Sequence, residues 1–166
     1  VNYGTSAVSG NITVKGNNAC GSGTVSTLAI TVNPLPVSAG TITGTSPVCQ
    51  GQSSVTYTVP AITNATSYTW TLPTGATGTS TTNSITVDFG TSAGSGNITV
   101  KGTNSCGDGG VSSLPITVNV KPATPTITLN GLVLQSDAPS GNQWYDQNGA
   151  ITGATYQDYS YSANGD

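Results

Sequence analysis

A stretch of 36 residues occurs twice in this chain, with the second copy offset by 86 residues. Residues 1–36 align with residues 87–122 without a gap, and 25 of the 36 positions are identical. Repetition at a fixed period is typical of arrays of similar structural units. Because Val1 aligns with Val87, in the second half of a unit, we expect the chain to open inside one domain. We also expect it to close in mid-strand at residues 164–166.

The complete unit, residues 37–120, alternates apolar and polar side chains. In SVTYTVP the side chains of Val55, Tyr57 and Val59 share one face. The same period of two continues in Tyr68, Trp70 and Leu72, in Ile85, Val87 and Phe89, in Ile98 and Val100, and in Leu114, Ile116, Val118 and Val120. With TITG at 41–44, this pattern predicts six or seven short strands, each with one buried face. Strands separated by Gly, Pro, Asn and Ser clusters indicate an all-β fold, an antiparallel β-sandwich.

Two bulky residues of the complete unit have predicted places. Trp70 lies in mid-strand near the centre of the unit, so we expect it to be a core residue. Pro115 is expected to face outward in the last strand, where it removes a hydrogen-bond donor. That position should therefore be a sheet edge or a bulge.

Proline-rich segments mark the domain boundaries. NPLP at 33–36 and VKPATP at 120–125 divide the chain into residues 1–36 (the C-terminal half of a unit), 37–120 (a complete unit) and 121–166 (the start of a further domain). Such linkers are short and extended because each Pro restricts φ. In the last part, TITLNG and LVLQS predict strands and Asn148-Gly149 predicts a hairpin. Trp144 is its predicted core residue.

The composition excludes most chemistry. The chain has three Lys, six Asp and no Arg, Glu or His, so charged residues make up 5% of it. Catalytic triads, Cys-His pairs and the common zinc sites need side chains that are missing. We therefore expect no catalytic residue, no enzyme activity and no cofactor. A net charge of -3 without a basic cluster argues against nucleic acid and against a polybasic membrane contact. No apolar run is long enough for membrane insertion.

Three cysteines occur, at 20, 49 and 106. Cys20 and Cys106 are equivalent across the repeat, and both lie in an N-x-C-G turn. We expect Cys49 and Cys106 to form a disulfide within the complete unit. The equivalent partner of Cys20 would lie before residue 1, so Cys20 is expected to be unpaired. A bridge over this loop would stabilise the unit by about 4 kcal/mol and indicates an oxidising compartment. A metal site is the competing interpretation, which a Cys pair without His supports poorly.

Several surface features have both a functional and an ordinary interpretation. Thr pairs at 41/43, 56/58, 69/71 and 126/128 would form hydroxyl ladders for ice or polysaccharide, or simply face solvent as good strand formers. Asp146 in DQNG, and Asp108 near Asn104, would contribute to calcium sites, or lie in ordinary turns. Exposed tyrosines would stack on sugars, or pack in the core or in an interface; they are Tyr156, Tyr159 and Tyr161. Sequons begin at Asn11, Asn64 and Asn97.

The motifs PVCQGQSSVTYTVPAITNATSYTWTLPTGA, NSITVDFGTSAGSGNITVKGTNSCGDGG and LPITVNVKP together resemble the PKD-like and immunoglobulin-like repeats of very large secreted proteins of Bacteroidota. Residues 124–166 resemble another immunoglobulin-like repeat of such proteins. The resemblance implies tandem immunoglobulin-like sandwiches, export by type IX secretion and display on the cell surface. It transfers no catalytic residue, only Cys49, Cys106 and Trp70 as structural positions.

The predicted function is mechanical. We expect a non-enzymatic stalk or spacer of a secreted cell-surface adhesin, of the kind used in gliding motility, which projects a binding region from the cell. Its expected partners are neighbouring domains, surface polysaccharide or glycan, and, by resemblance, the outer-membrane secretion machinery. The alternatives are a glycan-binding or surface-binding module, and accessory domains of a secreted enzyme.

Overall fold

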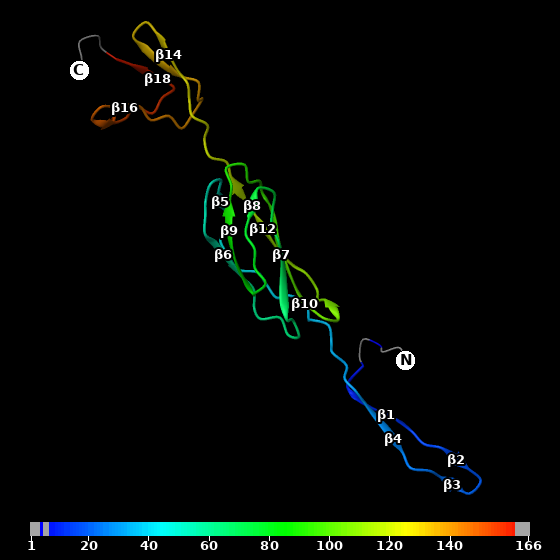
Figure 1. The fold of residues 1–166 in the computed structure, drawn as a ribbon. Helices are drawn as coiled ribbons and strands as arrows, with labels where there is room; N and C mark the ends of the chain where they lie inside the picture. Colours follow the sequence, from blue (N-terminus) through cyan, green and yellow to red (C-terminus); the bar gives the residue numbers. More distant parts are fainter. Residues whose placement is uncertain (1–3, 5–6, 162–166) are drawn as a thin grey trace. The chain divides into compact units, whose positions relative to one another are not determined.

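The structure is a computed structural model that describes residue 4 and residues 7–161. In this part of the chain every regular element is a β-strand, as the sequence predicts (Figure 1). The chain divides into two compact units, Val1–Lys121 and Pro122–Asp166. The first unit contains a hairpin and a complete β-sandwich domain.

The first sheet of the sandwich is built around one long strand, β10 (Gly96–Asn104). Strands β7 (Ser67–Thr71) and β12 (Ser112–Ile116) pair with it antiparallel on opposite sides, and the short β11 (Gly107–Asp108) folds back on its end. In this register Val100 lies opposite both Trp70 and Ser112. Because β12 pairs with β10 alone within the described residues, Pro115 is exposed on an edge strand, which confirms its predicted place.

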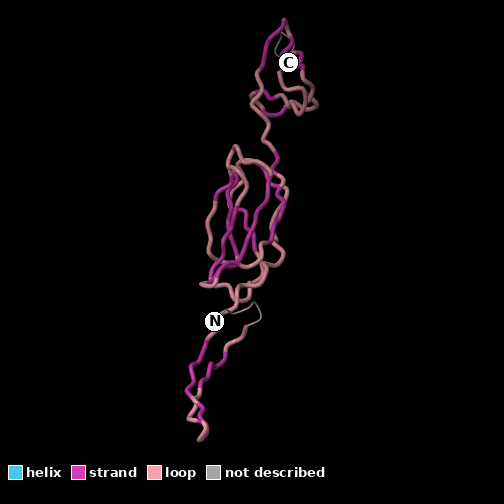
Figure 2. The backbone as a smooth tube through the Cα atoms, turned by 90° about the vertical axis from the view of Figure 1, so that its right-hand side faces the viewer, coloured by secondary structure: helices cyan, strands magenta, loops and turns pink. Residues whose placement is uncertain are grey.

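The second sheet faces the first and is led by β9 (Ser84–Phe89). Strand β9 lies between β6 (Val55–Thr58) and β8 (Ala76–Thr77), both antiparallel. After β12 the chain continues as β13 (Val118–Asn119), which pairs in parallel with β5 (Val48–Cys49). Figure 2 shows the strands of the domain running beside one another from end to end.

The core lies between the two sheets and follows the predicted alternation. Its buried members are Ile42, Val48, Val55, Tyr57, Val59, Ile85, Val87, Phe89, Ala93, Ile98, Val100, Ile116 and Val118. Tyr57 and Phe89 form its centre, with an edge-to-face contact at 6.5 Å between ring centroids. The prediction was wrong at Val120, which is 75% exposed because the chain has passed its last pairing at Asn119.

Trp70 is only half-buried and packs against this core from its margin. It lies on β7, whose one partner within the described residues is β10, and its indole N–H donates to the carbonyl of Thr82 at 2.9 Å. An indole needs such a partner when it leaves water. The predicted core tryptophan therefore covers the edge of the core, whereas Tyr57 fills its middle.

The two copies of the repeat form the same hairpin. Strands β1 (Gly10–Val14) and β4 (Ser26–Ile30) pair with the register of β10 and β12, and β2 (Asn17–Asn18) and β3 (Gly21–Ser22) reproduce the β10–β11 turn. Burial differs sharply, because the first copy has no facing sheet among the described residues. Ile12 is 44% exposed, whereas its equivalent Ile98 is 0% exposed.

The second unit holds a three-stranded sheet of β14 (Ile127–Asn130), β15 (Val133–Ser136) and β18 (Asp158–Ser160), and a hairpin of β16 (Tyr145–Asp146) and β17 (Gly149–Ala150). Trp144 is 8% exposed and stacks on Tyr159 at 5.8 Å, so it lies among the buried side chains of this unit. The hairpin turns at residues 147–148, one position before the predicted dipeptide, because Gly149 takes the positive φ (+125°) while pairing with Asp146.

Candidate functional site

The most elaborate polar arrangement of the complete domain holds the segment that leads into it. We call this arrangement the linker seat: Asn64, Asn104, Cys106 and Gly109, together with the linker residues 33–37. Pro34 and Pro36 have no N–H, so the linker cannot pair as an ordinary strand. Its carbonyls are left to accept hydrogen bonds from the domain. The seat provides three such donors.

Asn104 is the central residue of the linker seat. Its side-chain oxygen accepts the N–H of Cys106 at 2.8 Å, which fixes the amide, and its nitrogen donates to the carbonyls of Pro34 (2.8 Å) and Asn64 (2.9 Å). The first copy of the repeat has the same turn, with Asn18 accepting the N–H of Cys20 at 2.9 Å. The repeated N-x-C-G motif therefore builds the turn, and the second copy also holds the linker.

Further contacts fix the linker on both sides of this amide. The Cys106 thiol lies 3.2 Å from the carbonyl of Asn33 and donates to it. The Asn64 side chain, whose residue has φ +66°, donates to the carbonyl of Leu35 at 3.4 Å. The N–H of Val37 donates to the carbonyl of Thr63 at 3.1 Å. The linker is thus bound from Asn33 to the first residue of the domain.

Gly109 lets the linker approach the backbone closely. A Cβ at this position would lie 2.6 Å from the carbonyl oxygen of Val37 and 2.8 Å from that of Pro36. Both distances are far below an ordinary carbon–oxygen contact, and both atoms are backbone. In the first copy the equivalent Gly23 has only one neighbour, at 3.5 Å. The glycine is therefore required by the linker rather than by the turn.

The chain leaves the domain at the opposite end of β10. Ile116 lies opposite Gly96 at the start of β10, and β13 follows directly, whereas the linker seat lies at Asn104 and beyond. At the exit the carbonyls of Thr117 and Asn119 accept the N–H groups of Val48 and Gln50, both at 2.9 Å. A strand of nine residues spans about 30 Å, which is therefore the distance between entry and exit.

The same separation overturns the predicted Cys49–Cys106 disulfide. Cys49 pairs with Asn119 at the exit, whereas Cys106 lies in the linker seat at the entry. A disulfide needs Cα atoms about 4.4–6.8 Å apart. Cys49, Cys106 and Cys20 are all free and exposed. Sequence spacing could not reveal this, because it does not say at which end of a sandwich a turn lies.

The acidic candidates lie in ordinary turns and pairs. Asp108 forms an ion pair with Lys101 across the β10–β11 hairpin, and Asn104 serves the linker. Asp146 accepts the N–H of Asn148 at 2.7 Å, which is a local turn bond. Within residue 4 and residues 7–161, no group of three or more acidic, Cys or His side chains converges as metal ligands do.

The hydroxyl and tyrosine candidates do not form one surface. Thr56 and Thr58 face outward on β6, and Thr58 exchanges a 2.8 Å hydrogen bond with Thr43. The exposed Thr69 and Thr71 lie on the other sheet. Among the tyrosines, Tyr159 packs on Trp144, whereas Tyr156 is 78% exposed and so does not share that packing.

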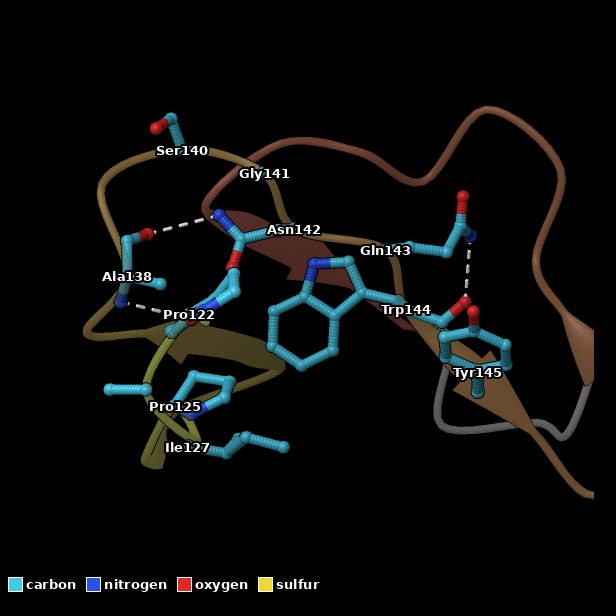
Figure 3. Close-up of a pocket in the computed structure, with 12 residues that line it drawn as sticks. Pro122, Pro125, Ile127, Ala138, Ser140, Gly141, Asn142, Gln143, Trp144 and Tyr145 are labelled. Atoms are coloured by element: carbon cyan, nitrogen blue, oxygen red, sulfur yellow. Dashed lines mark hydrogen bonds between the residues drawn. The ribbon is translucent and has the colours of Figure 1, made fainter. Parts of the chain in front are cut away.

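The second unit contains a pocket of about 310 Å³ beside Trp144. Figure 3 shows the Trp144 ring with Pro122, Pro125 and Ile127 on one side and the amide of Asn142 nearby. The Asn142 amide donates to the carbonyl of Ala138 at 3.0 Å, which orders the rim. An aromatic wall with an amide rim can accept an apolar or sugar-like group.

The fold defines a class of protein, the all-β immunoglobulin-like β-sandwich domains. Residues 35–116 match the family of PKD-like domains, which is just under half of the chain and covers most of the complete sandwich. The chain therefore contains a PKD-like domain. Domains of this kind are typically structural and non-catalytic, and they are often extracellular. No curated protein matches the chain.

In the part of the chain that is described, no helix is long and apolar enough to cross a bilayer.

Asn64, the donor to Leu35, was noted in the sequence only as a glycosylation sequon. Its place in a T-N-A turn before a strand is the signal that marks it as a residue of positive φ.

Proposed function

We propose that the chain is a non-enzymatic stalk or spacer region of a secreted cell-surface adhesin. In this proposal the PKD-like domain separates a binding region from the cell rather than binding a ligand itself. The sequence resemblance described above further suggests a Bacteroidota source, export by type IX secretion and a gliding-motility adhesin. Display on the cell surface and contact with surface polysaccharide belong to the same proposal.

The observation that carries the proposal is the position of the two chain ends of the domain. The linker enters at the Asn104 end of β10 and β13 leaves at the Gly96 end, so each domain of this kind adds about 30 Å to an extended chain. A domain whose ends lay side by side would add almost nothing. The linker seat supports the same function, because it restrains the joint.

The surface chemistry is also that of a spacer. The outward faces of β6 and β7 present hydroxyl groups, at Thr56, Thr58, Thr69 and Thr71. Lys101 and Asp108 neutralise each other, so neither offers a free charge to a partner. A neutral surface of this kind changes little with salt, because screening acts on exposed charges.

Single-molecule stretching of the full chain tests the mechanical role. Force applied through the ends loads β13 along its own direction, against the bonds of β5 and the N–H of Val118, which donates to the Ser95 hydroxyl at 2.8 Å. We expect one cooperative unfolding event for residues 37–121 with a gain in length of about 260 Å. Extension without a distinct force peak would contradict a load-bearing role.

A matched pair of variants makes this test specific. Ser95→Ala removes the bond that holds β13, so the unfolding force should fall. Ser113→Ala, an exposed position on β12, should leave the force unchanged. Equal effects of the two substitutions would refute the assignment of the load to β13.

Cell-surface display is tested separately. Antibody against residues 37–121 should label intact cells of the source organism, and the label should be lost in a strain without a functional type IX secretion system. Label that appears only after lysis would reject the surface location.

The pocket beside Trp144 favours one second function, binding of glycan by residues 122–161. Its aromatic wall and the amide rim of Asn142 and Gln143 have the chemistry that stacks on and hydrogen-bonds to sugars. Titration of the full chain with polysaccharide fragments, with Trp144 fluorescence as the signal, tests it. Saturable binding that is lost in Asn142→Ala, but kept in Asn130→Ala on the separate strand β14, would favour this function over the spacer.

A further inference from the structure

Each end of the PKD-like domain carries one exposed cysteine. Cys49 lies at the exit, where it pairs with Asn119, and Cys106 lies at the entry, where its thiol contacts the carbonyl of Asn33 at 3.2 Å. The Cys49 sulfur has no hydrogen-bond partner among the described residues, and the Cys106 thiol bonds only to the linker. The two cysteines are too far apart to react with each other, so any partner must come from outside the domain.

The repeat makes the neighbours of the two cysteines equivalent to each other. Asn33 and Asn119 are equivalent positions, 86 residues apart, in the shared sequence I-T-V-N. Cys49 is thus the strand partner of one asparagine of this pair, and Cys106 is the side-chain neighbour of the other. A PKD-like domain that ends in the sequence of residues 1–36 would place its own equivalent of Cys49 beside Asn33.

The two cysteines also share one edge of this strand. The carbonyl of Asn119 points at the strand that contains Cys49, because it accepts the N–H of Gln50 at 2.9 Å. The carbonyl of Asn33 points at the thiol of Cys106. The Gln50 N–H lies 2.9 Å from one of these two equivalent oxygens and the Cys106 sulfur lies 3.2 Å from the other. In a series of units one oxygen would take both roles, which would bring Cys106 beside the residue that follows Cys49.

We propose that successive PKD-like units are joined by a disulfide across their boundary, from the cysteine equivalent to Cys49 in the first unit to Cys106 in the second. Cys49 is exposed while the preceding Val48 is 1% exposed, so its side chain is directed away from its own core. The bond would fasten the exit strand of one unit to the linker seat of the next. This inference rests on the repeat and the geometry, and not on the stalk function.

The chemistry is an ordinary thiol–disulfide exchange. The two thiols lose two protons and two electrons, and one S–S bond forms. The oxidant is a protein or small-molecule disulfide, which accepts the electrons and protons and leaves as a dithiol or as two thiols. Residues 122–166 contain no cysteine that would receive Cys49.

The test extends the full chain by one half-unit. A second copy of residues 37–86 is placed directly before residue 1, which continues the 86-residue period and completes the first unit. The chain is folded with oxidised glutathione, its free thiols are alkylated without reduction, and its peptides are mapped by mass spectrometry. We expect one disulfide, between Cys49 of the added copy and Cys106, with Cys20 and the original Cys49 alkylated.

Two variants and one folding control accompany it. Cys→Ser at position 49 of the added copy should make Cys106 fully alkylated, whereas Cys20→Ser should leave the bridge unchanged. Amide exchange at residues 10–14 should slow to that of residues 96–100, which shows that the first unit has folded. With that protection present, alkylation of Cys106 in the unsubstituted chain, or its linkage to any other cysteine, would overturn the proposal.

Discussion

Gly44 is the position where one added methyl group should disturb the domain most. A Cβ there would lie 2.1 Å from Cδ1, 2.6 Å from Cε1 and 2.9 Å from Cγ of the Tyr57 ring. Gly44 does not have a positive φ, so its backbone accepts Ala and only the space is lacking. Gly44→Ala therefore measures how firmly the core holds the Tyr57 ring.

The magnitude follows from what fixes that ring. Tyr57 is 0% exposed, and its hydroxyl donates to the carbonyl of Thr45 at 2.8 Å. Its ring makes an edge-to-face contact with the ring of Phe89. To reach an ordinary contact the ring must retreat by about 1.5 Å. Overpacking on this scale costs about 3 kcal/mol, and loss of the hydroxyl bond adds about 1 kcal/mol. For a domain of this size the sum lowers Tm by roughly 15–25 °C.

Hydrogen exchange of the full chain over a urea series measures the change. The opening free energy reported by peptides from β6 and β9 should fall by about 3–4 kcal/mol in Gly44→Ala. Gly94→Ala is the matched control, since its Cβ would have no neighbour within 4 Å, and it should be neutral or slightly stabilising. In a Tyr57→Leu background the Gly44 substitution should cost far less, because the clashing ring is gone. An unchanged stability in Gly44→Ala would refute the packing of Tyr57 described above.

Three further outcomes are expected. Asn104→Ala should destabilise the domain by about 1–3 kcal/mol in urea unfolding, since three hydrogen bonds are lost, whereas the equivalent Asn18→Ala should cost less than half of that. Trp144→Ala should cost the second unit about 3–5 kcal/mol, seen as loss of its exchange protection. The Thr126 hydroxyl and N–H donate to Asp137 and hold the pKa of that carboxyl below its usual value. Its stabilisation should be complete above the ordinary carboxyl pKa and lost as the pH falls through the lowered one, and Asp137→Asn should remove this acid dependence of Tm.

The sequence predicted the sheets because alternation and burial are the same property in a sandwich. Val55, Tyr57 and Val59 could only share a face, and that face could only be the core. The same reasoning fails where strand pairing ends, as at Val120. There the sequence still alternates apolar and polar residues although the strand has already ended. Alternation also does not say how deeply a residue is buried. Trp70 was expected to be a core residue, whereas it is half-buried on an edge strand and packs against the margin of the core.

The linker seat was beyond a sequence reading for a different reason. Its donors come from residues 29 and 70 positions away from the carbonyls they satisfy, and a single amide side chain such as Asn104 looks like any turn residue. Only the prolines gave a hint, because a linker without N–H groups must find donors elsewhere. The cysteine pairing failed on the same point, since the order of turns along the chain does not state which end of the sandwich each one occupies.

The two ends of the PKD-like domain hold the chain with different kinds of hydrogen bond, and this difference would affect the stiffness of a joint between domains. At the exit, β13 is held by backbone bonds to β5, which end with the carbonyl of Asn119. At the entry, the linker is held by side chains, from the carbonyl of Asn33 to that of Leu35. Asn33 and Asn119 are equivalent in the repeat. In the proposed series of units, this one residue would end the β13–β5 pairing of one domain and begin the linker seat of the next. Such a joint would have no unbound residue between the two domains, and Asn104 and its neighbours in the downstream domain would set its stiffness.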